Sequence, residues 1–266
     1  MFDLVLHGPD TFVGVGPRYP WGGLYGGQIV AQALRAASNT VEPELLVHSL
    51  RAYFIRRGDH AEPVRYEVDR IRNGRSFATR RVVARQAVGA ILNLEASFQR
   101  TEESATVQPV VMPEVTGPEG LEETSWSAQF GRRFVPEDED VGVGRTGAGR
   151  TIAWMRVTDG LADPSSQLLH RCWLAYLSDD LAIDAALRAH PRRAALEDDD
   201  DRFSASLDHT IWFHRPLRAD VWHLHDVTCH AFVGGRGLSI GYVFAADGSH
   251  VATFAQELLL RGPVQR

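Results

Sequence analysis

The chain has 266 residues, of which 44% are hydrophobic and 23% charged, and its formal net charge is −6 at pH 7. This composition is ordinary for a globular protein, and the length is enough to bury a core without disulfides or a structural metal. A negative net charge argues against a nucleic-acid-binding protein, which needs a basic surface. Because only Cys172 and Cys229 are present, the sequence excludes a disulfide framework and favours a reducing, cytoplasmic location.

All 28 basic residues are arginine, since the sequence contains no lysine. This excludes a lysine Schiff base, lysine-bound pyridoxal phosphate and the lysine of a P-loop. No apolar run approaches the ~18 residues of a membrane-spanning helix, and the first residues lack the basic and apolar regions of a signal peptide. We therefore expect neither a membrane span nor a signal peptide.

The first part of the chain predicts one helix followed by four antiparallel strands. Apolar residues at helical spacing predict a helix over residues 25–37, with Gly26 and Gly27 at its start. Glycine and asparagine mark the turns between the β-like runs that follow. These runs occupy residues 46–56, 64–71, 76–86 and 90–99. Residues 101–149 are rich in Glu, Pro, Gly and Thr and have little periodicity, which predicts a linker.

The same pattern returns after the linker. Residues 150–157 predict a strand, and Asp163 followed by Pro164 predicts the start of a second helix that runs through Tyr176. Four more β-like runs occupy residues 203–215, 221–232, 238–246 and 251–260.

Short motifs recur between the two parts at nearly constant spacing. The separation is 159 residues from Arg56 to Arg215 and 157 from Gln99 to Gln256. Such a repeat indicates two similar units, each burying one apolar helix against a sheet. The sequence therefore predicts an α+β double hotdog fold. We expect an N-terminal half at 1–100, a linker at 101–149 and a C-terminal half at 150–266.

Three motif matches are better explained by structure than by chemistry. Residues 237–241 fit the G-x-S-x-G pattern around Ser239, but they run directly into β-like residues where a nucleophile elbow needs a helix. Residues 142–147 spell G-x-G-x-x-G, but they follow an acidic linker and precede a strand, the reverse of the dinucleotide-binding context. The acidic run Asp198–Asp201 is typical of a solvated loop.

A group of potential ligands around residue 226 also raises the question of a metal. Its members are His223, His225, Asp226, Cys229 and His230. Side chains on one strand alternate between two faces, and no helix or second cluster completes a site. We therefore predict no metal.

Six segments carry a resemblance to a known family. In the first part these are residues 24–34 (LYGGQIVAQAL), 47–56 (VHSLRAYFIR) and 72–81 (RNGRSFATRR). In the second part they are residues 174–179 (LAYLSD), 205–216 (ASLDHTIWFHRP) and 255–257 (AQE). In both content and order they resemble the two halves of acyl-CoA thioesterase II, and the resemblance covers essentially the whole chain.

This resemblance implies an enzyme that hydrolyses acyl-CoA, of medium to long acyl chain, to free acid and coenzyme A. In the family a carboxylate, a hydroxyl and an amide hold the hydrolytic water. Carried onto this chain, they fall on Asp179, Ser206 and Gln256, with serine where threonine is usual. Asp179 would act as general base, and neither a metal nor a cofactor is required. The neighbouring Asp180 leaves open which carboxylate points into the site.

The first half offers Val47 and Gln99 at the positions that match Ser206 and Gln256. Because the hydroxyl is missing there, we predict one working site per chain, in the C-terminal half. The resemblance also implies a homo-oligomer.

Substrate binding adds two further expectations. The helix start at Gly26, Gly27 and Gln28 is a candidate oxyanion site, since backbone N–H groups there can stabilise the developing charge. Coenzyme A is polyanionic, so an acidic protein must bind it through local arginines. The candidates near predicted turns are Arg56, Arg57, Arg75 and Arg236.

Three other functions remain open from the sequence. A hotdog enoyl-CoA hydratase or dehydratase would use an Asp/His pair, for which Asp208 and His209 are the adjacent candidates. A second alternative is a catalytically silent acyl-CoA-binding protein. A serine hydrolase acting through Ser239 is the third.

Overall fold

The computed structural model describes residues 1–139, 149–158, 160–197 and 202–262. The chain divides into two compact units. The first contains Met1–Val107, Asp163–Leu177 and Asp208–Phe213, and the second contains Gln108–Ala162, Ser178–Leu207 and His214–Arg266. One helix and one strand that follow the predicted linker in sequence therefore cluster with the first unit. The G-x-G-x-x-G motif at 142–147 and the acidic run at 198–201 lie outside the described residues.

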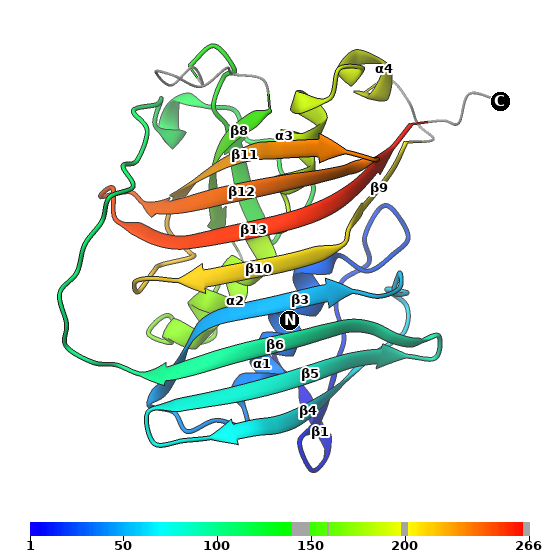
Figure 1. Cartoon of the computed structure of the whole chain (residues 1–266), viewed down its shortest axis with the longest axis vertical. Coiled ribbons are helices and arrows are strands. Elements are labelled where there is room, and N and C mark those ends of the chain that lie inside the picture. Colours follow the sequence, from blue (N-terminus) through cyan, green and yellow to red (C-terminus); the bar gives the residue numbers. More distant parts are fainter. Residues whose placement is uncertain (140–148, 159, 198–201, 263–266) are drawn as a thin grey trace. The chain divides into compact units, whose positions relative to one another are not determined.

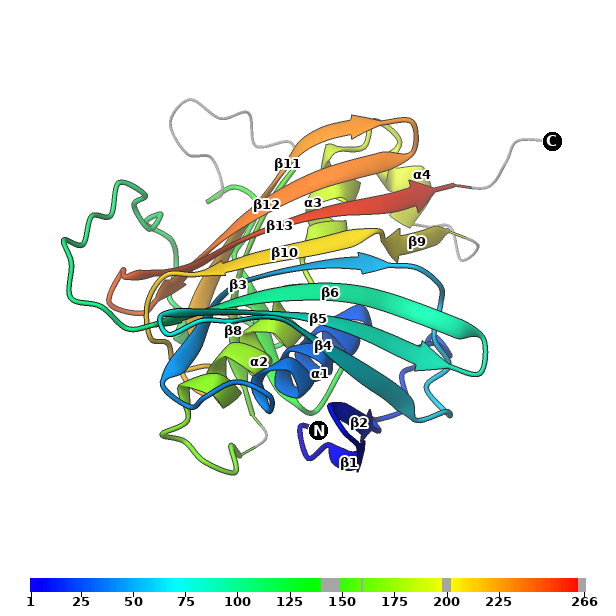
Figure 2. The same cartoon turned by 60° about the horizontal axis from the view of Figure 1, so that its bottom comes forward.

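The first unit contains an antiparallel sheet with the strand order β1-β2-β4-β5-β6-β3-β10. Its strands are β1 (Val5–Gly8), β2 (Thr11–Gly14), β3 (Leu45–Phe54), β4 (Val64–Asn73), β5 (Phe77–Gln86), β6 (Gly89–Arg100) and β10 (Asp208–Phe213). The helix α1 (Gly26–Ser38) packs against β3–β6, with α2 (Gln167–Leu177) beside it (Figures 1 and 2). The predicted first helix and the four strands after it are confirmed, with ends within two residues.

Close packing explains the glycine at the second position of α1. A Cβ on Gly27 would lie 2.3 Å from the carbonyl oxygen of Tyr176 in α2. The Tyr25 hydroxyl donates a hydrogen bond to the same oxygen (2.8 Å). Only glycine lets the two helices approach this closely, because any side chain would overlap with backbone.

The second unit contains an antiparallel sheet with the order β9-β13-β12-β11-β8-β7. Its strands are β7 (Phe130–Phe134), β8 (Arg150–Val157), β9 (Phe203–Ser206), β11 (His223–Val233), β12 (Arg236–Ala245) and β13 (His250–Arg261). The helix α3 (Ala182–Ala189) packs on β8, β11, β12 and β13, and α4 (Arg193–Glu197) follows it. A short 3-10 helix, η1 (Pro118–Gly120), lies in the segment before β7.

The structure differs from the predicted elements at several places, beginning with β1 and β2, which were not predicted. The second helix begins at Gln167, because Asp163 forms a turn by accepting hydrogen bonds from the amide and hydroxyl of Ser165. The predicted linker contains β7, and α3 and α4 were not predicted. The predicted strand 203–215 is interrupted at Leu207, and its two parts, β9 and β10, belong to different units.

The hydrogen-bond register corrects one correspondence between the halves. The amide of Arg100 donates to the carbonyl oxygen of Ser76, just as that of Leu260 donates to Gly235, which aligns Ser76 with Gly235 and, four residues later, Arg80 with Ser239. Ser239 lies opposite Gln256, whereas Arg80 lies opposite Ala96. The counterpart of Gln256 is therefore Ala96, and the assignment of Gln99 is wrong. An odd shift of three residues places Gln99 on the other face of its strand.

The same register confirms Val47 as the counterpart of Ser206. Val47 lies opposite Phe98, and Ser206 lies opposite Leu258. Phe98 follows Ala96 by two residues, just as Leu258 follows Gln256. The first half thus has neither the hydroxyl nor the amide at these positions.

The residues of the G-x-S-x-G motif pack closely against α3 and against β13. A Cβ on Gly237 would lie 2.8 Å from the Cβ of Ala186 in α3, and a Cβ on Gly241 would lie 2.2 Å from the Phe254 ring. Between them, the fully buried Ser239 donates a hydrogen bond to the carbonyl oxygen of Ala182, the first residue of α3 (2.8 Å). The motif therefore lies inside a continuous strand and not at a nucleophile elbow, and the Ser239 hydroxyl makes a structural hydrogen bond.

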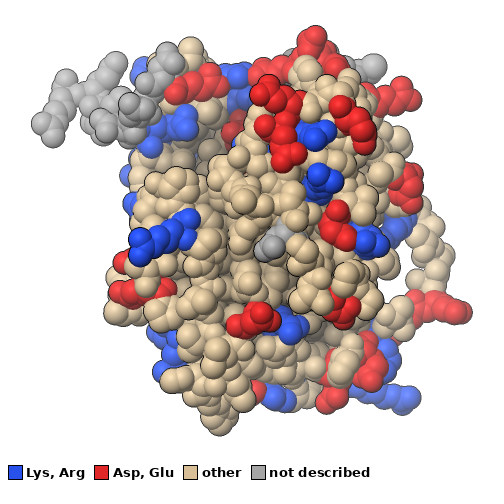
Figure 3. Space-filling view, turned by 180° about the vertical axis from the view of Figure 1, so that it is seen from behind, with Lys and Arg blue, Asp and Glu red and all other residues tan. Residues whose placement is uncertain are grey.

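The surface carries charges of both signs. On the face seen in Figure 3, arginine and acidic side chains are interspersed, with uncharged surface between them. None of the helices in the described part of the chain is long and apolar enough to cross a membrane.

Candidate functional site

The structure brings Asp179, Ser206 and Gln256 together in one hydrogen-bonded chain within the second unit. The Gln256 side-chain amide donates from Nε2 to Ser206 Oγ (2.8 Å), and Ser206 Oγ donates to Asp179 Oδ1 (2.8 Å). Gln256 is fully buried and Asp179 is 4% exposed. The chain of donors is therefore directed toward a carboxylate that is shielded from bulk water.

Three separate elements position these side chains. Asp179 lies in the short turn between the end of α2 and the start of α3, and Ser206 is the last residue of β9. Ser206 lies opposite Leu258 on β13. Gln256 precedes Leu258 by two residues, so strand alternation places its side chain on the same face. A hydrogen-bonded chain that joins Asp179 to Gln256 through Ser206, and so spans 77 residues in sequence, thus follows from the register of two strands and one turn.

The adjacent carboxylates point to different partners, which answers the question that the sequence left open. Asp180 accepts hydrogen bonds from Trp126 Nε1 (2.6 Å) and from Arg132 Nη1 (2.6 Å). Its side chain is 7% exposed and that of Arg132 is 12% exposed. Asp179 faces Ser206, whereas Asp180 forms a largely buried ion pair on the other side of the turn.

Apolar side chains surround Gln256, and a further buried carboxyl, that of Asp184, lies in the helix that follows Asp179. Phe254 and Leu258, both fully buried, flank Gln256 on the same face of β13. Burial raises the pKa of Asp184, in the first turn of α3, to about 6. The negative charge of Asp180 contributes to this rise, while the positive charges of Arg132, Arg188 and Arg202 oppose it.

The predicted oxyanion residues lie in the first unit, at the start of α1. The Gln28 side chain is fully buried, accepts a hydrogen bond from the Tyr19 hydroxyl (2.7 Å) and donates to Gln32 Oε1 (3.4 Å). Its side chain thus serves the interior of that unit. A role of the backbone N–H groups of Gly26, Gly27 and Gln28 stays a prediction.

The four arginines predicted to bind coenzyme A do not form one cluster. Arg56 donates to the carbonyl of Ala90 near the start of β6, and the carbonyl of Arg75 accepts from Arg100 at its end. These ends of a 12-residue strand are on the order of 35 Å apart. Arg57 donates to the carbonyl of Trp21 (2.6 Å).

Arg236 belongs to the second unit but faces away from Gln256. It pairs with Glu257 (2.8 Å), and consecutive residues of a strand point to opposite faces. The guanidinium of Arg236 therefore lies on the face of the sheet opposite to the Gln256 amide.

Among the potential metal ligands on β11, the carboxylate already has a partner of opposite charge. Asp226 forms a bidentate ion pair with Arg150 (2.7 and 2.9 Å). Burial, followed by the influence of His223, holds the pKa of His225 well below the usual imidazole value. Among the residues that the structure describes, no group of three or more His, Cys, Asp or Glu side chains could hold a metal ion.

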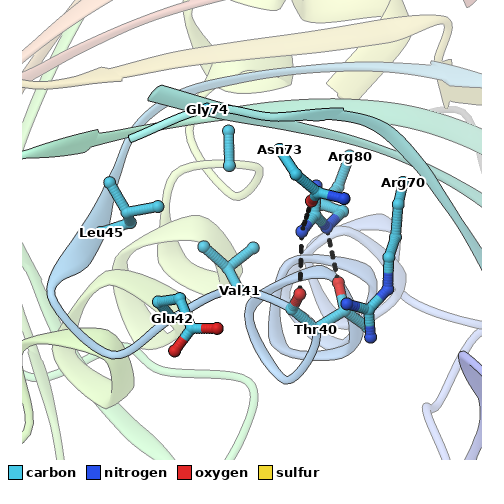
Figure 4. Close-up of a pocket in the computed structure, with 9 residues that line it drawn as sticks. Thr40, Val41, Glu42, Leu45, Arg70, Asn73, Gly74 and Arg80 are labelled. Atoms are coloured by element: carbon cyan, nitrogen blue, oxygen red, sulfur yellow. Dashed lines mark hydrogen bonds between the residues drawn. The ribbon is translucent and has the colours of Figure 1, made fainter. Parts of the chain in front are cut away.

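A pocket of about 290 Å³ lies in the first unit, where the chain leaves α1 (Figure 4). Its wall includes the guanidinium of Arg80, which donates to the hydroxyl and the carbonyl of Thr40 and to Asn73 Oδ1. Arg80 occupies the position that corresponds to Ser239. Both side chains donate a hydrogen bond to a backbone carbonyl in the segment that follows a helix, Arg80 to Thr40 and Ser239 to Ala182.

Sequence reasoning missed Trp126 and Arg132, the two partners of Asp180. Both lie in the segment predicted as a linker, about 50 residues before the carboxylate that they contact. The tryptophan and arginine in an otherwise polar segment were the available signal, since both types favour partly buried contacts.

Comparisons with known proteins match both halves of the chain. Residues 16–99 match the model of the acyl-CoA thioesterase N-terminal domain, and residues 107–260 match that of the C-terminal domain. Acyl-CoA thioesterase 2 of Haemophilus influenzae is 34% identical over 254 residues, which cover 90% of this chain and 87% of the relative.

Solved structures show the same architecture. The acyl-CoA thioesterase II TesB2 of Mycobacterium marinum is 34% identical, with a TM-score of 0.86 over 100% of this chain and 97% of that one. A protein with a hot dog fold from Alicyclobacillus acidocaldarius is 21% identical, with a TM-score of 0.78 over 99% of this chain and 97% of that one. The predicted double hotdog fold is confirmed, and the chain belongs to the acyl-CoA thioesterase family.

Proposed function

We propose that this protein hydrolyses acyl-CoA thioesters to free acid and coenzyme A, and that Asp179, Ser206 and Gln256 hold the attacking water. The observation that carries this proposal is the hydrogen-bonded chain from Gln256 through Ser206 to Asp179. Family membership supplies the substrate class. No cofactor or metal enters the proposed reaction.

In the proposed reaction Asp179 acts as the general base. It takes a proton from a water molecule that Ser206 and Gln256 orient, and the water oxygen attacks the thioester carbonyl carbon. The resulting tetrahedral adduct collapses with cleavage of the carbon–sulfur bond, and the departing thiolate of coenzyme A takes the proton from Asp179, which regenerates the carboxylate. The apolar surroundings of Gln256, formed by Phe254 and Leu258, favour an apolar acyl group, and we propose medium to long chains.

The hydratase alternative loses its candidate pair. Asp208 and His209 are consecutive residues of β10, so their side chains point to opposite faces of the sheet. They cannot act together on one substrate as an acid–base pair. The protein's cytoplasmic location and its assembly as a homo-oligomer stay predictions.

Release of free thiol from acyl-CoAs of graded chain length tests the proposal. We expect turnover by the wild type and a fall of ~10²–10⁴-fold in Asp179→Asn, because the general base is lost. Gln256→Ala should also lower turnover, since the water loses one of its ligands. Turnover indifferent to Asp179 would reject the mechanism, and tight binding without turnover would favour the silent binding protein.

A further inference from the structure

We propose that Asp180, Arg132 and Trp126 form a positioning device that holds Asp179 in its working orientation. The inference rests on the proposed function of Asp179. It gives a role in the reaction to the segment before β8, which the sequence alone presented as a linker.

The turn that carries Asp179 is short and held from both sides. It comprises residues 178–181, between the last residue of α2 and the first of α3. On one side Ser239 binds the carbonyl oxygen of Ala182 (2.8 Å). On the other side the Asp180 carboxylate is bound through both oxygens, one by Trp126 and one by Arg132. With the next side chain fixed, the backbone at Asp179 has little freedom to rotate.

The partners of Asp180 are themselves fixed. Arg132 also donates to the carbonyl of Thr124 (3.0 Å), and its guanidinium lies 4.7 Å from the centre of the Phe134 ring. The Trp126 ring packs edge-on against the buried Phe130, with centroids 5.0 Å apart. Such preorganised support distinguishes a positioning contact from a mobile surface ion pair.

The ion pair between Asp180 and Arg132 also determines the net charge next to Asp179. Arg132 neutralises Asp180, so the second carboxylate adds little repulsion to the first. Removing Arg132 would leave an additional buried negative charge and disfavour the ionised base. Removing the Asp180 charge would leave a positive charge and favour the ionised base. The two single substitutions therefore push the pH dependence of the reaction in opposite directions.

The test compares Arg132→Gln, Asp180→Asn and the double variant, measuring kcat, KM and the acid limb of the pH–rate profile. We expect each single variant to lose about 10- to 100-fold in kcat with little change in KM, because the base is misplaced after the substrate has bound. The acid limb should move to higher pH in Arg132→Gln and to lower pH in Asp180→Asn. The double variant, which buries no unpaired charge, should lose less than the product of the two single losses.

Two controls test whether the shifts of the acid limb come from the Asp180–Arg132 pair and not from nearby charged residues. Arg133→Gln removes an adjacent arginine that contacts Glu123 and Trp222 instead, and should leave the acid limb in place. The opposite shifts should persist in an Asp184→Asn background, which removes the other carboxyl coupled to Asp180 and Arg132 while Arg188 and Arg202 remain.

The outcomes separate the two proposals. Folded variants whose acid limbs stay in place or move together would overturn the positioning role alone, provided that Asp179→Asn is inactive. If a single variant does not fold, the double variant decides, because wild-type kcat in it would show that the pair is dispensable. A wild type without turnover, or an active Asp179→Asn, overturns the proposed function and the positioning role with it.

Discussion

At the scale of single residues, the serine at position 206 makes the central contact of the candidate site. Its hydroxyl accepts a hydrogen bond from the Gln256 amide and donates one to the Asp179 carboxylate. Because the buried amide is fixed, these two hydrogen bonds also fix the position of the carboxylate. Threonine offers the same donor and acceptor with one more methyl group. The departure from the family's usual threonine is therefore conservative in chemistry.

Exchange of this hydroxyl should separate a water-holding serine from a nucleophilic one. We expect Ser206→Thr to retain most of the activity. Ser206→Ala should lose ~10- to 100-fold in kcat, since deleting one hydrogen-bonding partner in a buried site costs about 1–3 kcal/mol. Steady-state thiol release measures both variants, and Ser204→Ala on the same strand is the matched control.

A nucleophilic serine would give a different pattern. Ser206→Ala would then abolish turnover, and the wild type would carry an acyl group on Ser206 that mass spectrometry detects during turnover. Either result would replace the held water by a covalent intermediate.

At the scale of elements, the predicted strands and helices are long enough to show a period, whereas the missed ones are short. α1 repeats apolar residues at helical spacing, and Ile29, Val30 and Leu34 are all buried as that spacing predicts. By contrast, α3 has only 8 residues and β7 has 5, too few for a period to stand out. Their positions depend on contacts distant in sequence, which single-chain patterns do not contain.

The residues of the candidate site likewise fall into those that the sequence predicted and those that it missed. Asp179, Ser206 and Gln256 were predicted because each lies in a short motif whose order matches a known family. Trp126 and Arg132 lie in no such motif, and their contact with Asp180 forms only when the segment before β8 folds against the turn that follows α2. Gln99 was misassigned because motif spacing cannot register an insertion in a turn, whereas hydrogen-bond pairing can.

The close packing between β12 and β13 can be tested through one glycine of β12. A methyl group at Gly241 would lie 2.2 Å from the ring of the fully buried Phe254, which faces it across the two strands. We expect Gly241→Ala to reduce the free energy of unfolding by about 1–3 kcal/mol, the usual cost of overpacking. Thermal or denaturant unfolding measures the change.

The smaller side chain in Gly241→Ala/Phe254→Leu should restore part of the lost stability. Gly160→Ala is the control, since a Cβ there meets nothing within 4 Å. A Gly241→Ala variant as stable as the wild type would show that the glycine is not required by packing.

At the scale of the whole molecule, two similar halves carry different chemistry at matching positions. The C-terminal half has Ser206, Gln256 and Ser239 where the N-terminal half has Val47, Ala96 and Arg80. The fold is retained in both because the alternation of buried residues is retained. The hydroxyl and the amide are not needed for that alternation, so one half can lack them without loss of structure.

This asymmetry predicts one working site per chain, whatever the number of chains in the assembly. We expect a non-hydrolysable thioether analogue of acyl-CoA to bind with a stoichiometry of one per chain by titration calorimetry. Asp179→Asn should then remove nearly all turnover, because the first half has Val47 and Ala96, which cannot hold a water, at the positions of Ser206 and Gln256. A second working site would instead leave about half of the turnover and bind two analogues per chain. Measurement of the mass in solution alongside the titration separates the number of sites from the number of subunits.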